Sequence, residues 1–342
     1  MRNIKVAAIQ PGSVPMPDAC NWQHPGYCGK AERVVDEYLS QRMAITFDLL
    51  EQAGREGCDI VTTCEDSGGA GAYMADVSTP PLADVHDENT TRSMFSELVE
   101  RTAPMLEARF SEIAARYAMY VVGCYFKRIG GHNSNIAAIF DRTGRNVGHY
   151  HKTHLPPDET WQSVPGDTIE TFDLDFGRIG LSICYDMMFP EQVHILSLKG
   201  AEIIFHPTFG YGWYDGIGEA TLRTRANDGS LYIVTSKSAV FNGAGKSGIV
   251  DPWGHIVAQA GFEENVIVTK VIDLDNKKTQ PDWHNPTRMS GVADVRLRMI
   301  RERHPELYAT LCEPVSEPFA APDPARQLEI RQEILDGRCR WS

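Results

Sequence analysis

Short apolar runs rich in β-branched residues alternate with longer amphipathic segments along most of the chain. Such a run, bounded by turn residues, is typical of a buried β-strand. The predicted strands are Ile4–Ile9, Ile60–Thr63, Met119–Phe126, Asn135–Asp141, Arg178–Ile183, Glu202–His206, Leu231–Ser236, Ser247–Val250, His255–Ala260 and Val266–Ile272.

The segments between these runs predict helices. One apolar stripe extends from Val34 to Phe47, and a second follows Leu106, Phe110, Ile113 and Tyr117 at i, i+4, i+7 and i+11. This spacing places apolar side chains on one helical face. Two further helices are expected, one directly after Cys184 and one at about residues 217–228.

The alternation of strands and helices predicts an α/β fold in which helices cover the faces of sheets. Residues 135–145 and 247–260 read as hairpins, the second turning through Asp251, Pro252, Trp253 and Gly254. Hairpins require antiparallel strands, so the sheets are expected to be mixed. We therefore predict a four-layer α-β-β-α sandwich and not a doubly wound fold.

The chain divides by composition into residues 1–311, predicted to form one domain, and a proline-rich tail at 312–342. A loop rich in proline, glycine and aromatic residues covers Pro11–Gly29. We interpret the loop and the tail as contact or lid elements. The sequence shows no internal repeat and no low-complexity segment.

Charge and cysteine content narrow the class of protein. The 342 residues carry a net charge of −13, which argues against nucleic acid and anionic membranes as partners. No signal peptide and no membrane span is recognisable, so a cytoplasmic location is expected. Eight scattered cysteines without a CxxC motif are expected to be mostly reduced thiols, although Cys20 and Cys28 could pair in an oxidising compartment.

Cys184 ends a predicted strand in the segment Gly-Arg-Ile-Gly-Leu-Ser-Ile-Cys-Tyr-Asp-Met-Met-Phe-Pro-Glu. A thiol at a strand-to-helix turn is exposed and lies near the positive end of the helix dipole. This position suits a nucleophile. A lone cysteine is more often a buried structural residue, so the position alone does not decide.

Two further segments carry candidate chemistry. Glu65 and Asp66 directly follow the strand Ile60–Thr63, at the end where α/β folds place their sites. Lys152 lies among three histidines before a Pro-Pro turn. A fixed ammonium could stabilise an oxyanion, whereas the ordinary alternatives are a turn cap for the carboxylates and a solvated charge for the lysine.

Together and in this order the three segments resemble the nitrilase superfamily of carbon–nitrogen hydrolases, in its amidase or carbamoylase-like branch. That family has a glutamate after an early strand, a Lys-x-His-Leu-Pro type segment and a Cys-Tyr-Asp-x-x-Phe-Pro-Glu type segment. The similarity covers about Lys5 to Tyr308 and includes the stretches 201–207, 222–228, 247–254, 272–275 and 303–308.

The resemblance implies that Cys184 is the nucleophile, Glu65 the general base and Lys152 the oxyanion stabiliser. A second glutamate often follows the lysine, and Glu159 matches it best, with Asp158 one residue away. The backbone N–H of Tyr185 is expected to join Lys152 at the oxyanion. One departure is Cys64, at a position where a proline often precedes the glutamate.

The predicted function is cysteine-dependent hydrolysis of a linear amide or N-carbamoyl amine through a thioester, with release of ammonia and without cofactor or metal. Tyr185-Asp186 replaces the Trp-Glu of nitrilases, which favours amides over nitriles. Met187 and Met188 stand where hydrolases of N-carbamoyl amino acids often carry basic residues, which disfavours such anions. Candidate substrate-binding side chains are Tyr73, Trp161, Phe209, Tyr211 and Trp213, and Asp215 could meet a cation or amine.

Several alternatives remain open at this stage. Nitrile hydrolysis or acyl transfer could use the same three residues. A zinc metallohydrolase could use the cluster His149, His151 and His154, with His206 after a later strand. A non-catalytic interaction protein would not need all three catalytic residue types. The resemblance also implies a homodimer or a larger homo-oligomer.

Overall fold

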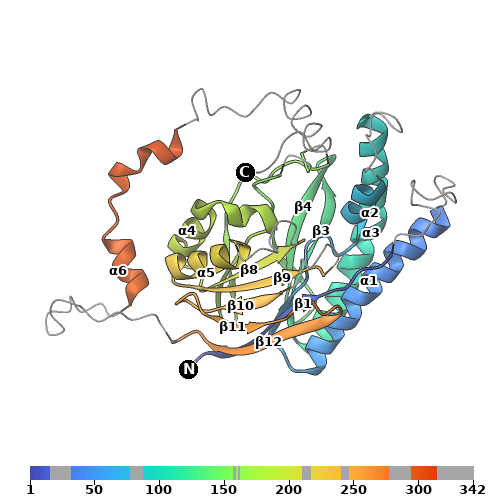
Figure 1. Ribbon diagram of the computed structural model, residues 1–342. Coiled ribbons are helices and arrows are strands. Elements are labelled where there is room, and N and C mark those ends of the chain that lie inside the picture. The colour runs from blue at the N-terminus through green and yellow to red at the C-terminus, as the bar shows by residue number, and fades with distance from the viewer. Residues whose placement is uncertain are drawn as a thin grey trace, which may run out of the picture. The chain divides into compact units, whose positions relative to one another are not determined.

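Two six-stranded mixed sheets form the centre of the protein, and a computed structural model shows their arrangement (Figure 1). The structure describes residues 1–15, 32–77, 88–156, 159–160, 162–209, 217–239, 246–276 and 294–313. Its contacts separate into two units, Met1–Leu297 and Arg298–Ser342, and each is described by itself. The predicted domain boundary after residue 311 remains a prediction.

The first sheet has the order β12-β1-β2-β3-β4-β5. Strands β1, β2 and β3 are parallel, and antiparallel pairs add β12 on one side and β4 and β5 on the other. Its strands are β1 (Asn3–Gln10), β2 (Ile60–Thr62), β3 (Tyr120–Ile129), β4 (His132–Phe140), β5 (Asn146–His151) and β12 (Val266–Asp273).

The second sheet repeats this design in the order β11-β10-β9-β8-β7-β6, with β7, β8 and β9 parallel. Antiparallel neighbours β6, β10 and β11 complete it. Its strands are β6 (Thr171–Leu174), β7 (Gly177–Leu181), β8 (Ile203–Thr208), β9 (Tyr232–Lys237), β10 (Gly248–Val250) and β11 (Ile256–Gln259).

Helices cover the outer face of each sheet. The first sheet is covered by α1 (Glu32–Arg55) and α3 (Glu88–Tyr117), with the short α2 (Ala70–Val77) beside them. The close approach of α3 depends on Gly123 of β3, because a Cβ atom there would lie 2.4 Å from the Phe110 ring. The second sheet is covered by α4 (Pro190–Leu198) and α5 (Ile217–Gly229).

Three apolar clusters correspond to the three interfaces between these layers. The cluster between the two sheets includes Val6, Val122, Leu181, Phe205 and Val234, all of them fully buried. Central strands are apolar on both faces because each face packs on another layer. This arrangement confirms the predicted four-layer α-β-β-α sandwich.

Each predicted strand has a counterpart, but the sequence missed β5 and β6. The predicted hairpin at 135–145 is the start of the β4–β5 hairpin, which turns at residues 141–145. The helix expected after Cys184 begins as a 3₁₀ turn, Cys184–Met188, and continues as α4. A final helix, α6, covers Val295–Arg301, and two short 3₁₀ turns follow at Pro305–Leu307 and Ala309–Cys312.

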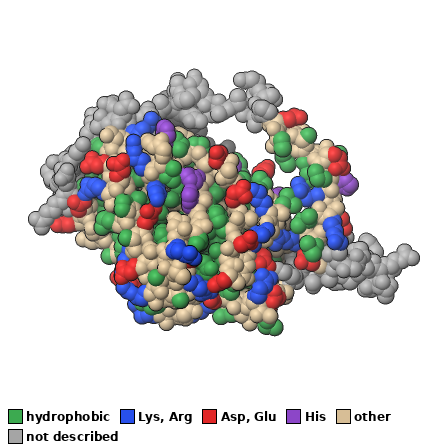
Figure 2. Space-filling view, turned by 180° about the vertical axis from the view of Figure 1, so that it is seen from behind, with side chains coloured by type: hydrophobic (Ala, Val, Ile, Leu, Met, Phe, Trp, Pro, Cys, Tyr) green, Lys and Arg blue, Asp and Glu red, His purple; other side chains and the backbone are tan. Residues whose placement is uncertain are grey.

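The surface agrees with the mixed charge pattern of the sequence. Figure 2 shows acidic and basic side chains interspersed over the face in view, with no large area of one sign. Within the described ranges, no helix is both long and apolar enough to cross a membrane.

The inter-sheet core should dominate stability. Phe205→Ala removes a ring that is fully buried between the sheets, so the free energy of unfolding should fall by about 3–5 kcal/mol. Urea denaturation followed by circular dichroism measures the loss. The matched control is Val147→Ala on β5, where the side chain is 46% exposed and the loss should stay below about 0.5 kcal/mol. Equal losses for the two variants would contradict this view of the core.

Candidate active site

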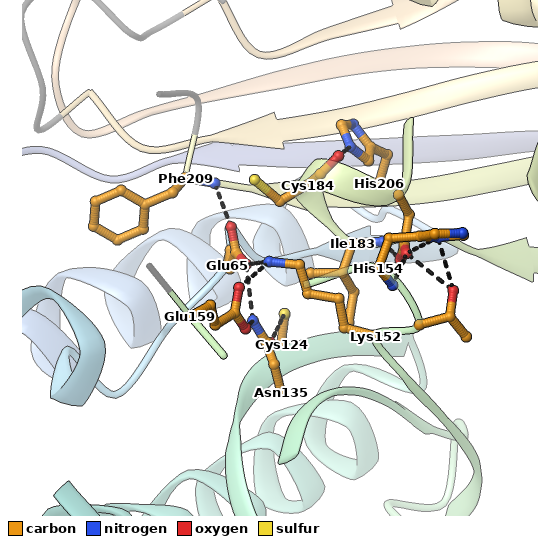
Figure 3. Close-up of polar contacts among 12 residues, drawn as sticks. Glu65, Cys124, Asn135, Lys152, His154, Glu159, Ile183, Cys184, His206 and Phe209 are labelled. Carbon is orange, nitrogen blue, oxygen red and sulfur yellow. Dashed lines mark hydrogen bonds and ion pairs between the residues drawn. The ribbon is translucent and has the colours of Figure 1, made fainter. Parts of the chain in front are cut away.

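The three predicted catalytic residues meet at one end of the sandwich (Figure 3). Glu65 follows β2, Lys152 follows β5 and Cys184 follows β7. Strands β2 and β5 run in the same direction, because two antiparallel steps separate β5 from β3. Their carboxyl ends therefore lie at the same edge of the first sheet, and Cys184 reaches this edge from the second sheet.

The Glu65 carboxylate is buried and accepts several hydrogen bonds. Its Oε1 lies 2.8 Å from both Lys152 Nζ and Asn135 Nδ2. Its Oε2 accepts the backbone N–H of Phe209 at 2.9 Å. The Cys184 thiol is a further hydrogen-bond partner. Glu65 is thus fixed between the ammonium and the sulfur.

Lys152 is almost completely buried and lies between two carboxylates. Its Nζ contacts Glu65 at 2.8 Å and also donates a hydrogen bond to Glu159. Asn135 Nδ2 bridges the pair, since it lies 2.9 Å from Glu159 Oε1 and 2.8 Å from Glu65 Oε1. Asn135 also accepts the backbone N–H of Lys152 through its own carbonyl oxygen at 2.9 Å. This network holds the lysine in one position.

Cys184 occupies a tight turn with left-handed backbone geometry. Its φ angle is +46°, a region in which non-glycine residues are uncommon and strained. The predicted elbow between strand and helix is therefore present. The thiol also contacts the side chain of Thr208 on β8, and the Cys184 carbonyl oxygen lies 3.2 Å from His206 Nε2.

Asp186 connects the turn at Cys184 to the segment around Lys152. Its Oδ2 accepts the Ile183 N–H at 2.9 Å and the Tyr150 hydroxyl at 2.7 Å. Its Oδ1 accepts the Thr153 hydroxyl at 3.1 Å and the His154 N–H at 2.9 Å, and lies 2.9 Å from His154 Nδ1. The carboxylate is completely buried. One side chain thereby fixes the residues before Cys184 relative to those on both sides of Lys152.

Burial and neighbouring charges set the protonation states. Burial raises the pKa of the Cys184 thiol to about 12; Glu65 adds to this and Lys152 opposes it. Burial also acts to raise the pKa of Glu65, but the Lys152 ammonium and hydrogen bonds from Lys152, Cys184 and Phe209 outweigh it, so that pKa is lowered. The resting pair is therefore a thiol beside a carboxylate.

The second carboxylate behaves differently. Burial raises the pKa of Glu159 to about 7; Lys152 opposes this shift and the charge of Glu65 adds to it. Burial acts to lower the pKa of Lys152, but Glu65, Cys184 and Glu159 together hold it well above its usual value. Lys152 is therefore a permanent cation, and Glu159 changes charge near neutral pH.

This arrangement has the parts needed for acyl transfer to sulfur. A thiol touches a carboxylate that can take its proton, and a fixed ammonium lies beside both. An oxyanion formed next to the sulfur would meet this ammonium in a buried place, where electrostatic stabilisation is strong.

The remaining predicted residues have varied surroundings. The Tyr185 ring packs edge-on against Phe189, with the ring centroids 5.4 Å apart. Tyr73 is buried beside Tyr38 in the cluster under α1 and α3. Phe209 contributes its backbone N–H to Glu65. Asp158, Trp161, Tyr211, Trp213 and Asp215 lie outside the described residues, as do Cys20 and Cys28.

The histidines of the zinc alternative do not converge. The rings of His149 and His151 lie 5.0 Å apart on β5, while His154 stacks on Phe189 at 3.9 Å and contacts Asp186. In the described ranges no group of three or more His, Cys, Asp or Glu side chains is placed to hold a metal ion.

Sequence reasoning missed Asn135, Thr208 and the linking role of Asp186. Asn135 and Thr208 lie within strands, where polar side chains are usually turned toward solvent, yet both are buried. A buried polar side chain within an apolar strand is the signal that could have found Asn135.

Comparison with known proteins agrees with this geometry. The sequence model of the family described as carbon–nitrogen hydrolase matches residues 5–280. The chain belongs to the carbon–nitrogen hydrolase family. The family prediction is confirmed.

Two curated relatives of this carbon–nitrogen hydrolase are named amidases. Omega-amidase NIT2 of Homo sapiens is 30% identical over 233 residues, which are 63% of this chain and 79% of the relative. N-carbamoylputrescine amidase of Solanum tuberosum is 28% identical over 244 residues, which are 63% of this chain and 77% of the relative.

Solved structures show the same fold. An amidase from Nesterenkonia sp. superposes with a TM-score of 0.63 at 18% identity, covering 90% of this chain and 96% of that one. A carbon–nitrogen hydrolase from Helicobacter pylori G27 has a TM-score of 0.66 at 22% identity, with 92% and 99% covered. With these relatives, the carbon–nitrogen hydrolase described here is an amidase-like enzyme that hydrolyses a non-peptide carbon–nitrogen bond, as the sequence predicted.

Asp186→Asn should damage both stability and activity of this carbon–nitrogen hydrolase. The amide group would direct its own N–H toward backbone or hydroxyl donors, leaving buried groups unpaired, so the free energy of unfolding should fall by about 2–4 kcal/mol. We also expect kcat/KM to fall by about 10²-fold, because Cys184 and Lys152 lose their common anchor.

Tyr150→Phe is the milder comparison, because it removes one hydroxyl that contacts Asp186 and leaves the carboxylate in place. Its loss of stability should be about 1 kcal/mol. Denaturation and steady-state kinetics on both variants test the anchor. Wild-type kinetics in a folded Asp186→Asn enzyme would show that Asp186 does not anchor Cys184 and Lys152.

Proposed function

We propose that the enzyme hydrolyses small linear amides through a Cys184 thioester, with Glu65 as general base and Lys152 as oxyanion stabiliser. The observation that carries this proposal is the buried Glu65 carboxylate, which contacts both the Lys152 ammonium and the Cys184 thiol. The protonation states described above match the roles proposed, since Glu65 rests as a carboxylate that can accept a proton and Cys184 rests as a thiol that can supply one.

The first half of the reaction forms the thioester. Glu65 takes the thiol proton while the Cys184 sulfur attacks the amide carbon, and the carbonyl oxygen becomes an oxyanion. Lys152 and the backbone N–H of Tyr185 bind this oxyanion. Glu65 then gives its proton to the amide nitrogen, the carbon–nitrogen bond breaks, and ammonia leaves.

The second half returns the enzyme to its resting state. Glu65 takes a proton from water, whose oxygen attacks the thioester carbon. The oxyanion again meets Lys152 as the carbon–sulfur bond breaks. The thiolate of Cys184 recovers its proton from Glu65, and the carboxylic acid leaves. Glu159 holds Lys152 in place throughout.

The relatives' names support an amide as substrate. Both are called amidases, and one of them acts on an N-carbamoyl amine. Hydrolysis of an N-carbamoyl amine is therefore the second candidate, because its carbonyl carbon also carries an NH₂ group. Nitrile hydrolysis by the same three residues is disfavoured by Tyr185-Asp186 after the nucleophile. Substrate contacts by Tyr73, Trp161, Phe209, Tyr211 and Trp213 remain predictions.

We also propose that the enzyme works in the cytoplasm as a homodimer or larger homo-oligomer. The described cysteines Cys58, Cys64, Cys124, Cys184 and Cys312 are all free, which supports a reducing compartment. In the second unit Leu307 is 73% exposed and Leu311 is 67% exposed, and apolar side chains of this kind favour a protein contact.

Cys184→Ala should abolish ammonia release. The variant has no nucleophile, so turnover should fall by about 10⁴-fold or more on carboxamides and N-carbamoyl amines. Glu65→Gln should lose about 10³-fold, because an amide cannot accept the thiol proton. The assay covers carboxamides, N-carbamoyl amines, N-carbamoyl amino acids and nitriles, with and without a chelator.

Cys58→Ala is the matched control, since it removes a buried free thiol remote from the site and should retain turnover. Activity that survives Cys184→Ala and is lost with chelator would overturn the cysteine mechanism in favour of a metal. Intact protein mass during turnover should show the acyl group on the wild-type chain but not on Cys184→Ala.

The pH dependence of kcat/KM should follow the ionisation of Glu159. Ionisation of Glu159 near pH 7 adds a negative charge beside Glu65 and makes Glu65 a stronger base, so kcat/KM should rise as pH increases through about 7. In Glu159→Gln this rise should disappear between pH 6 and 8, and the rate should fall by about 10-fold or more. An unchanged inflection in the variant would assign it to another group.

A further inference from the structure

A buried histidine behind the turn at Cys184 has no role in the mechanism above. His206 lies in β8 and is completely buried. Its Nε2 lies 3.2 Å from the backbone carbonyl oxygen of Cys184, and its Nδ1 lies 3.0 Å from the Thr235 hydroxyl. In Figure 3 this carbonyl oxygen faces the His206 ring, whereas the Cys184 sulfur points away from the ring. His206 therefore acts on the backbone of Cys184 and not on its thiol.

Strand register explains the contact between His206 and Thr235. Strands β8 and β9 are parallel neighbours in which these two residues are paired, so their side chains leave the same face of the sheet. Two residues earlier the pair on this face is Ile204 and Ile233, which belong to the apolar cluster under α4 and α5. His206 and Thr235 are thus a polar pair in an apolar layer. Such a pair loses its hydration on folding, whereas a second pair of aliphatic side chains would not.

The hydrogen-bond partners of the ring identify its tautomer. A backbone carbonyl oxygen can only accept, so the His206 Nε2 carries the hydrogen. Burial lowers the pKa of His206 to about 4, although the hydrogen bond to Cys184 opposes the shift, and the ring is therefore neutral near neutral pH. A neutral imidazole has a single N–H, so Nδ1 accepts a hydrogen bond from the Thr235 hydroxyl. Thr235 thus holds the ring as the Nε2–H tautomer.

The peptide group that His206 contacts also contains the expected oxyanion donor. The Cys184 carbonyl and the Tyr185 N–H belong to one planar trans peptide group, in which they point in opposite directions. A donor that fixes the carbonyl oxygen therefore also fixes the direction of the N–H. Donation to the carbonyl polarises the peptide group as well, which strengthens the N–H as a donor.

The turn at Cys184 needs such a contact. Its φ angle of +46° is strained, and a peptide group within a turn can rotate as a unit between two turn conformations. This rotation would move the Tyr185 N–H away from the oxyanion. Asp186 anchors the chain before Cys184 through the Ile183 N–H. His206 anchors the peptide group that follows Cys184.

We propose that His206 is a positioning residue for oxyanion stabilisation. Held by Thr235 as the Nε2–H tautomer, it anchors the Cys184 carbonyl oxygen and so directs the Tyr185 N–H toward the oxyanion of the substrate. This inference rests on the amidase mechanism proposed above, in which the Tyr185 N–H and Lys152 bind that oxygen. It adds a contact from the outer face of the second sheet to a site otherwise built at the inner edge.

His206→Leu removes the donor and leaves an aliphatic side chain in the layer. We expect kcat to fall by about 10- to 100-fold while KM stays within about 3-fold, because the oxyanion forms only in the transition state. His206→Gln carries an amide N–H that can replace Nε2–H, and should recover most of the loss. Steady-state kinetics of ammonia release from a carboxamide measures both constants. Wild-type kcat in His206→Leu would overturn the proposal, as would equal losses in the two variants or a change in KM alone.

Variants of β9 separate positioning from packing. Thr235→Val keeps the shape of the side chain but removes the hydroxyl that holds the ring, so kcat should fall by about 3-fold or more, and Thr235→Ser should restore it. Ile233→Val is the matched control, because it removes one methylene group from a fully buried neighbour on the same face. It should lower stability and keep the wild-type kcat. Equal falls in kcat for Ile233→Val and Thr235→Val would overturn the proposal in favour of packing.

A spectroscopic measurement tests the tautomer directly. NMR of wild-type protein with isotope-labelled histidine nitrogens should show His206 near neutral pH as a neutral ring with its hydrogen on Nε2. The signal is assigned by its absence from the His206→Gln spectrum. A ring with its hydrogen on Nδ1, or a charged ring, would overturn the proposal.

Failure of the amidase function itself has a different signature. It would appear as no ammonia release from any carboxamide by the wild-type enzyme, or as release that persists in Cys184→Ala. Failure of the proposal for His206 would instead leave wild-type turnover and its dependence on Cys184 intact. The two hypotheses can thus be distinguished.

Discussion

The buried group of one ammonium between two carboxylates is the constraint on which the site depends. Removing charged groups from water costs several kcal/mol per ion, and close pairing with additional hydrogen bonds is needed to offset this cost. Lys152 meets Glu65 and Glu159, and Asn135 donates to both carboxylates. These buried charges are stabilised only while the ends of β2, β4 and β5 hold the four side chains in contact. The charged group therefore depends on correct pairing of these strands.

The proposed nucleophile belongs to the other sheet, so the contact between the two sheets sets the geometry of the proposed catalytic group. Cys184 follows β7, whereas Glu65 and Lys152 follow strands of the first sheet. Apolar packing between the sheets brings Cys184 close to Glu65 and Lys152. Such packing is not directional, so it does not by itself fix their exact distances. Asp186 supplies this fixation through hydrogen bonds to both halves. A strained turn at Cys184 is tolerable because its neighbours hold it.

The sequence predicted those strands whose structure follows from burial alone. The runs that became β1, β8 and β9 are buried on both faces, and burial alone makes them apolar and continuous. Strands β5 and β6 were missed because they lack a continuous apolar run, as the polar residues of Asn146–His151 show. The edge strands β11 and β12 do carry such runs and were predicted. Their pairing partners, and not their own composition, define them as strands.

The site was predictable to the extent that it lies in local motifs. Glu65, Lys152 and Cys184 were predicted from their segments, and the structure brings the three together. The burial of Lys152 disagrees with the ordinary alternative for a lone lysine, a solvated surface charge. Asn135 comes from a strand whose sequence gives no sign of chemistry, and only the pairing of β4 with β5 brings it to the site.

The high pKa of Cys184, the proposed nucleophile, also matters outside the catalytic cycle. Oxidation by peroxide and alkylation both begin from thiolate, and the fraction of thiolate is minute for a thiol that titrates near 12. On the proposed mechanism, Cys184 is thus protected between turnovers and reacts when a carbonyl carbon is held beside it while Glu65 removes the proton. A selective inhibitor of this enzyme would accordingly need an electrophile shaped like the amide, since general reactivity toward thiols would favour other proteins with more acidic thiols.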